Sequence, residues 1–218
     1  TQAIRIDGQL DDWNQANPLF IHPEGRLSGL TFFARDYGGE MQWTGLEDFS
    51  AAWQMLWDAD NLYLAVKAWD DQILPYKPLG DFWNGDTITF QIDPQPETTD
   101  AGPLPVARDL WDIHTFEMAL ETLESGEYQP VIRRKHPTHQ HPAGIVKTIR
   151  LAALRVSDGI VYELAIPWQE LAPLTPITKN WLGLSMVFYE DDGNGRETRI
   201  NWFGGSGGNG LAREPRLM

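Results

Sequence analysis

Residues 62–69 read LYLAVKAW and residues 86–93 read DTITFQID, and both stretches alternate with a period of two. Every second residue of the first stretch is Leu, Leu, Val or Ala, and in the second Ile88, Phe90 and Ile92 alternate with polar residues. A period of two places successive side chains on opposite faces of a β-strand. Both stretches therefore predict half-buried strands.

The same pattern recurs along most of the chain. Alternating or apolar stretches predict further strands over residues 3–6, 30–34, 51–57, 113–120, 128–133, 145–156, 160–167, 181–190 and 198–203. Asp158-Gly159 is typical of a tight hairpin turn, and helical patterns reach only one turn, over 11–15 and 167–171. About eleven short strands with turns between them predict an all-β chain, a single antiparallel β-sandwich domain over residues 1–218.

Composition excludes several function classes. The formal net charge of the 218 residues is −14, from 17 basic and 31 acidic residues, and this field repels phosphates and anionic lipids. We therefore expect neither nucleic acid nor a membrane as a partner. Cysteine is absent, which excludes disulfides, thiolate zinc sites and cysteine nucleophiles. An acidic, tryptophan-rich chain that begins at Thr1 predicts a secreted or periplasmic protein.

Ten tryptophans are the first candidates for ligand binding. An aromatic ring can lie flat against the apolar face of a sugar. Most of the ten are expected in the core, among them Trp53 and Trp57, which share a strand face with Met55. Trp83 lies in a loop without strand alternation, and Trp202 precedes a glycine-rich tail. We predict these two as ligand platforms.

An acidic turn is the second candidate. Residues 190–197 read EDDGNGRE, which packs oxygen atoms around two glycines as a hard cation such as calcium requires. We predict Asp191, Asp192 and Asn194 as calcium ligands, with Asp7 from the N-terminal turn as a further partner. The alternative is that these residues only form tight turns.

Residues 135–142, KHPTHQHP, hold three of the five histidines. Imidazoles can bind zinc or copper, but the two prolines and the lack of a nearby carboxylate favour a solvated loop. The chain has no Gly-x-Ser-x-Gly elbow, no His-Glu-x-x-His motif and no phosphate loop. A metal-dependent enzyme that uses this loop is therefore only a third hypothesis.

Five motifs, in order along the chain, resemble those of family 9 carbohydrate-binding modules and their relatives. They are IDGQLDDW at 6–13, LWDADNLYLAV at 56–66, WNGDTI at 83–88, YELAIPW at 162–168, and the closing segment 183–192 followed by Gly195-Arg196 and Trp202. The resemblance implies a jelly-roll-like sandwich that holds a sugar, often a chain end, between two tryptophans. It also implies structural calcium and a covalently linked, secreted polysaccharide-degrading enzyme.

Carried over residue by residue, the resemblance makes Trp83 and Trp202 the two clamping tryptophans. The carboxylate that the family places three residues after the aspartate of its Gly-Asp pair falls on Thr89 here, which departs from the family pattern. We expect four further residues to bind sugar hydroxyls: Arg108, His114, Glu117 and Asn201.

The leading hypothesis is non-catalytic carbohydrate binding. The alternative is a haem b electron-transfer domain of the same sandwich superfamily, whose axial ligands would include a histidine or lysine and a methionine. His114 and Met118 have the right side chains, but they lie in no matching motif.

Overall fold

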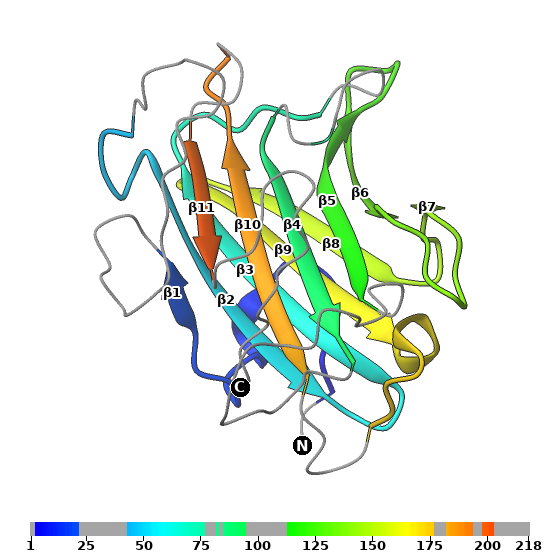
Figure 1. The fold of residues 1–218 in the computed structure, drawn as a ribbon. Coiled ribbons are helices and arrows are strands. Elements are labelled where there is room, and N and C mark those ends of the chain that lie inside the picture. Colours follow the sequence, from blue (N-terminus) through cyan, green and yellow to red (C-terminus); the bar gives the residue numbers. More distant parts are fainter. Residues whose placement is uncertain are drawn as a thin grey trace, which may run out of the picture.

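The structure is a computed structural model that describes residues 3–21, 43–76, 82, 85–94, 113–176, 182–193 and 198–202. Two antiparallel sheets pack face to face (Figure 1). The predicted antiparallel β-sandwich is confirmed.

The five-stranded sheet has the order β1-β2-β3-β9-β8. Its strands are β1 (Leu19–Ile21), β2 (Phe49–Trp57), β3 (Asn61–Asp70), β9 (Gly159–Pro167) and β8 (Arg150–Val156). Two 3-10 helices are described: η1 (Leu10–Asp12) precedes β1, and η3 (Trp168–Leu171) directly follows β9. Among the described residues, no helix is long and apolar enough to cross a membrane.

The six-stranded sheet has the order β11-β10-β4-β5-β6-β7. Its strands are β11 (Thr198–Trp202), β10 (Gly183–Glu190), β4 (Thr87–Asp93), β5 (His114–Thr122), β6 (Tyr128–Arg134) and β7 (Gly144–Ile145).

The core lies between the sheets and consists of the alternating residues that the sequence singles out. Leu64 and Val66 on β3 face the same cluster as Phe90 on β4 and Phe116 on β5, and all four are buried. The rings of Phe90 and Phe116 stack with their centroids 5.2 Å apart. Burying each such side chain stabilises the fold by about 1.5–3 kcal/mol.

Several local predictions were wrong. Residues 3–6 form no strand, and the stretch 145–156 divides into β7 and β8. Trp57 is 62% exposed, because it is the last residue of β2, where the hairpin to β3 begins. The predicted strand 30–34 lies outside the described residues.

The predicted hairpin between β8 and β9 exists, but its turn differs by one residue. Strand pairing extends to Val156 and Gly159, so the two turn residues are Ser157 and Asp158. Gly159 has φ +135°, and a Cβ there would lie 2.0 Å from the carbonyl oxygen of Ala68. Glycine is therefore required by the close approach of β3.

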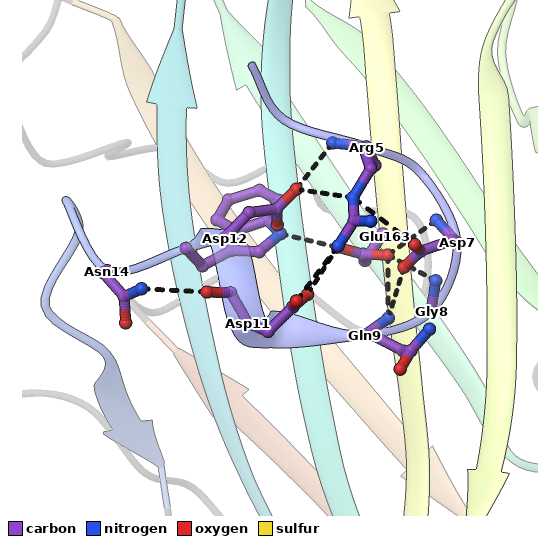
Figure 2. A network of polar contacts seen from close by, with 9 residues as sticks. Arg5, Asp7, Gly8, Gln9, Asp11, Asp12, Asn14 and Glu163 are labelled. Atoms are coloured by element: carbon purple, nitrogen blue, oxygen red, sulfur yellow. Dashed lines mark hydrogen bonds and ion pairs between the residues drawn. The ribbon is translucent and has the colours of Figure 1, made fainter. Parts of the chain in front are cut away.

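A buried carboxylate joins the N-terminal loop to the five-stranded sheet (Figure 2). Glu163 of β9 is fully buried, and its Oε2 accepts hydrogen bonds from the backbone N–H groups of Asp7 (2.9 Å), Gln9 (3.1 Å) and Gly8. The indole Nε1 of Trp13 donates to Oε1 at 2.6 Å. Burial raises the pKa of Glu163 above its ordinary value, and these donors oppose the shift.

The same contacts explain the sequence of the loop. Gly8 has φ +86°, and a Cβ there would lie 2.7 Å from the Cβ of Leu154 on β8. Arg5 closes the loop from the solvent side, where its guanidinium binds Asp11 at 3.0 Å (Figure 2). Because the backbone of residues 7–9 donates to Glu163, the segment cannot continue as a strand.

A second buried network connects the two sheets. Arg134 of β6 is 1% exposed, and its Nη1 donates to Nδ1 of His114 on β5 at 2.8 Å. Its Nη2 donates to the Glu170 carboxylate of η3 at 2.8 Å. The Nε2 of His114 lies 3.0 Å from the carbonyl oxygen of Ala172 and therefore donates to it. Because Arg134 can only donate, His114 must be the neutral Nε2–H tautomer.

We predict that Glu163→Gln destabilises the protein. An amide places an NH2 group opposite either the indole or the three backbone donors, so at least one hydrogen bond is lost. The expected loss in the free energy of unfolding is about 2 kcal/mol, which lowers Tm by roughly 4–8 °C in a chain of this size. Thermal unfolding measures it. Glu121→Gln is the control, since Glu121 is only partly buried and accepts from the Gln129 side chain alone; equal losses in both variants would contradict the role of Glu163.

A second prediction concerns acid. Burial, and then the charge of Arg134, lower the pKa of His114 to about 4, below its ordinary 6.5. Between pH 6.5 and about 4, the unfolded chain binds a proton at His114 that the folded chain does not bind. The contribution of His114 to stability is therefore fully present above pH 6.5 and is lost as pH falls towards 4. Urea unfolding across this range should show a decline that includes about 3 kcal/mol from His114. The decline should be smaller in His114→Gln; an identical decline in both proteins would exclude His114 as its source.

Candidate functional site

The outer face of the six-stranded sheet, which points away from the five-stranded sheet, carries a band of polar residues. Strand register aligns Val187 of β10, Thr89 of β4, Glu117 of β5 and Arg133 of β6 in one row. In an adjacent row, Gln91 accepts from Ser185 at 3.4 Å and donates to Thr115 at 3.3 Å. Most of these side chains are buried, and Arg133 and Gln91 are partly exposed. This polar face is the strongest candidate for a binding site.

Three charged residues form the centre of this face, and we call them the Glu117 triad: Glu117, Arg133 and Lys135. Arg133 Nε donates to Oε2 of Glu117 at 2.7 Å, and Lys135 Nζ lies 2.8 Å from Oε1. The Glu117 side chain is 0% exposed, whereas those of Arg133 and Lys135 are 31% and 30% exposed. The Glu117 carboxylate therefore binds two positively charged side chains, and both of these side chains are partly exposed.

An aromatic ring covers one side of the triad. The guanidinium carbon of Arg133 lies 3.9 Å from the centroid of Phe82, which fixes the plane of the guanidinium by a cation–π contact. Phe82 packs in turn on Tyr76, with centroids 4.3 Å apart, and its carbonyl accepts the hydroxyl hydrogen of Thr87. Phe82 is thus anchored beside the polar face.

The predicted sugar-binding residues divide between described and undescribed positions. Trp83 and Arg108 lie outside the described residues. Asn201 and Trp202 belong to β11, where their backbones pair with Val187 and Met186, and their side chains are not described. Asn201 is therefore at the end of the row that contains Thr89, Glu117 and Arg133.

Glu117 and His114, predicted as partners of one ligand, lie on opposite faces of β5. Glu117 is on the outer face, and His114 stacks on Phe116 on the inner side, with both ring nitrogens bound by Arg134 and Ala172. His114 therefore holds Arg134 in place. Because side chains alternate along β6, fixing Arg134 inward directs Arg133 and Lys135 outward.

A cluster of carboxylates gathers where β2 begins and β3 and β10 end. Asp48, Asp71 and Asp192 each contribute one carboxylate oxygen, and these three oxygens lie within 4.8 Å of one another. Oxygen ligands 2.3–2.6 Å from a calcium ion are at most about 5 Å apart. The donor set therefore fits a hard cation.

Three further carboxylates surround this cluster and are buried or nearly so. Burial, reinforced by neighbouring carboxylates, raises the pKa of Asp70 to about 6 and that of Glu190 to about 8. The pKa of Asp86 is raised well above its ordinary value for the same reasons. Such repulsion among buried carboxylates disappears if a cation neutralises them.

The cluster differs from the predicted ligand set. Asp192 lies at the cluster and Asp191 beside it, where the Asp191 backbone N–H donates to Asp86 at 3.0 Å. Asn194 lies outside the described residues. Asp7 lies elsewhere, on the outer face of the five-stranded sheet beside Glu163, and the other members of the cluster are Asp48 and Asp71.

The histidine loop shows no comparable arrangement in the described part of the chain. His141 Nε2 lies 2.9 Å from the carbonyl oxygen of Gln169, and its backbone N–H donates to Thr138 Oγ1 at 3.1 Å. These contacts tie the loop to η3. They give it a structural role.

Sequence reasoning missed Arg133, Lys135 and Asp48, and it left Asp71 out of the predicted calcium ligands. One signal was available for the first two: Arg133-Arg134-Lys135 is a run of three basic residues in a chain of net charge −14. Strand alternation places its first and third members on one face. No comparable signal exists for Asp48 and Asp71, because three separate strand ends bring the acidic cluster together.

Comparisons with known proteins agree with the fold. Residues 33–103 match the family model described as "Carbohydrate family 9 binding domain-like". No curated protein matches the chain.

Two solved structures of a family 9 carbohydrate-binding module from Caldicellulosiruptor kristjanssonii have the same fold. The complex with cellotriose has a TM-score of 0.56 and 18% identity, and the match covers 95% of this chain and 83% of that one. The complex with glucose has a TM-score of 0.57 and 18% identity, with coverage of 95% and 85%. The resemblance of this chain to family 9 carbohydrate-binding modules is thus confirmed, in sequence over residues 33–103 and in fold over nearly its whole length.

Proposed function

We propose that this chain binds carbohydrate without catalysis, on the outer face of its six-stranded sheet. The observation that carries the proposal is the Glu117 triad, set in a polar sheet face beside an aromatic ring. The fold is that of modules whose structures hold cellotriose and glucose.

The chemistry of the face suits a sugar. Sugar binding requires a few fixed polar groups for the hydroxyls and aromatic rings for the apolar faces. Arg133 on β6 and Lys135 directly after it are about a third exposed and offer donors, and Gln91 on β4 is partly buried beside them. Rigid placement limits the entropy lost on binding.

We further propose that Trp83 and Trp202 clamp the sugar, as the family resemblance implies. Trp83→Ala and Trp202→Ala should each remove a stacking contact and lower affinity roughly tenfold or more. Isothermal titration against a panel of neutral and acidic oligosaccharides measures the loss, and Tm should stay within a few degrees. Trp57→Ala is the matched control, because Trp57 is an exposed tryptophan at a hairpin. If the clamp variants bind like the parent, the tryptophans do not hold the ligand.

The findings do not support the haem alternative. Both ring nitrogens of His114 already have protein partners. Met118 lies four residues along the same strand, roughly 13 Å away. Two residues so placed do not ligate one iron from opposite sides. A purified protein without a Soret band would agree with this reading.

We also propose that a structural calcium ion binds Asp48, Asp71 and Asp192. The support is the spacing of their oxygens and the raised pKa of the buried carboxylates around them. A bound cation would stabilise the ends of β3 and β10 by removing that repulsion. It would act on the fold, and the Glu117 triad at β5 and β6 contributes none of its ligands.

Calcium should therefore raise Tm, and EDTA should lower it. Mass action gives about 2.7 kcal/mol at a hundredfold excess over Kd. Asp71→Asn should abolish most of the calcium response. Asp158→Asn, an exposed aspartate paired with Lys67, should leave the response intact. A Tm that neither calcium nor EDTA changes, in a protein that elemental analysis shows to be metal-free, would overturn the proposal.

The family resemblance also motivates a wider context: a secreted or periplasmic protein in which this domain is linked to a polysaccharide-degrading enzyme. Such a domain would hold the enzyme at its substrate and raise the local substrate concentration.

A further inference from the structure

The Glu117 triad is not electrically neutral. Arg133 and Lys135 are two basic residues and Glu117 is one acidic residue, so the formal charge of the triad is +1. The other acidic side chains described on this outer face, Glu121 and Asp93, lie four residues from Glu117 and Thr89. Four residues span roughly 13 Å along a strand, beyond the Debye length in physiological salt.

The exposed hydrogen-bonding groups of the triad are donors. Oε2 of Glu117 accepts from Arg133. Oε1 lies 2.8 Å from Lys135 Nζ in an ion pair but has no hydrogen-bond partner among the described residues, and the Glu117 side chain is fully buried, so a ligand from solvent meets the two basic side chains first. Arg133 uses Nε on Glu117, which leaves the N–H groups of its two Nη atoms, and a lysine ammonium carries three N–H groups. Both cations are partly exposed. Glu117 therefore acts as a positioning residue for two outward-facing cations.

A second observation points to the same place. Thr89 is 7% exposed, and its Oγ1 has no hydrogen-bond partner among the residues that the structure describes. It lies beside Glu117 in the register row. A buried hydroxyl without a partner is costly, and a ligand at this position would satisfy it.

We propose that this face selects an acidic sugar, with the ligand carboxylate bound between Arg133 and Lys135. The inference rests on the proposed carbohydrate function. A planar guanidinium held against Phe82 can donate two parallel hydrogen bonds to a carboxylate, and the ammonium adds a third. A carboxylate would bring the net charge of the triad to zero, whereas a neutral hydroxyl leaves it at +1.

The net charge of −14 limits the size of the ligand. A long polyanion would meet the repulsive field of the whole chain, whereas one acidic residue at contact distance meets chiefly the triad. The ligand is therefore a short acidic oligosaccharide or the acidic end of a chain.

Isothermal titration with matched pairs tests the proposal. Short oligosaccharides of galacturonate, glucuronate and mannuronate are each compared with their carboxyl-reduced neutral counterparts, and with glucose and cellotriose. At neutral pH we expect at least one acidic member to bind tenfold or more tightly than its neutral counterpart. Lys135→Met should reduce the ratio of the acidic to the neutral affinity to between one and three. Lys135→Arg should preserve it, and Lys67→Met, a charge-matched change on the other sheet, should leave it unchanged.

The possible outcomes separate the two proposals. Binding of neutral sugars as tightly as their acidic counterparts overturns the acidic-sugar inference and leaves the carbohydrate function standing. An acidic preference that survives in both Lys135→Met and Arg133→Gln overturns the assignment to the triad. Failure of the folded parent protein to bind any sugar in the panel, acidic or neutral, counts against both.

Discussion

The hydrogen bonding of the buried Glu163 carboxylate to the N-terminal loop is the interaction on which the rest of the fold depends. A buried charge is tolerated only when hydrogen bonds replace its lost hydration, and here the N-terminal loop supplies all of them. Trp13 can donate to Glu163 only by packing beside Tyr63 and Ala65, so the loop covers part of the outer face of the five-stranded sheet. That face serves the stability of the fold, and the charged triad occupies the outer face of the other sheet.

The motifs that made the family recognisable are mostly of this structural kind. Asp58 accepts from two backbone N–H groups of its own hairpin and from the hydroxyl of Tyr63, and its carbonyl accepts from the indole of Trp168. Asp86 accepts from the backbone N–H groups of Leu74 and Asp191. Each of these contacts requires one residue type at one place, which is why short motifs predict the fold so well. They carry little information about the ligand.

The candidate site was harder to predict, because it depends on strand register and not on local pattern. Alternation along β5 placed His114 and Glu117 on opposite faces, yet only the pairing with β6 shows that Glu117 meets Arg133. The acidic cluster likewise needs β2, β3 and β10 to end at the same place, and no sequence spacing encodes that. The prediction that Trp57 lies in the core was wrong for a related reason. Periodicity gives the face of a strand, but it does not show where the opposite sheet ends.

Acidic and basic side chains gather in different parts of the sandwich. At the ends of β3 and β10, carboxylates accumulate to the point where burial and mutual repulsion raise the pKa of Glu190 to about 8. On the outer face of β5 and β6, two cations share one carboxylate. Beyond a Debye length of about 8 Å a ligand meets the net charge of the whole chain, and at contact it meets the triad. An acidic protein can therefore present a basic site to a ligand at contact distance.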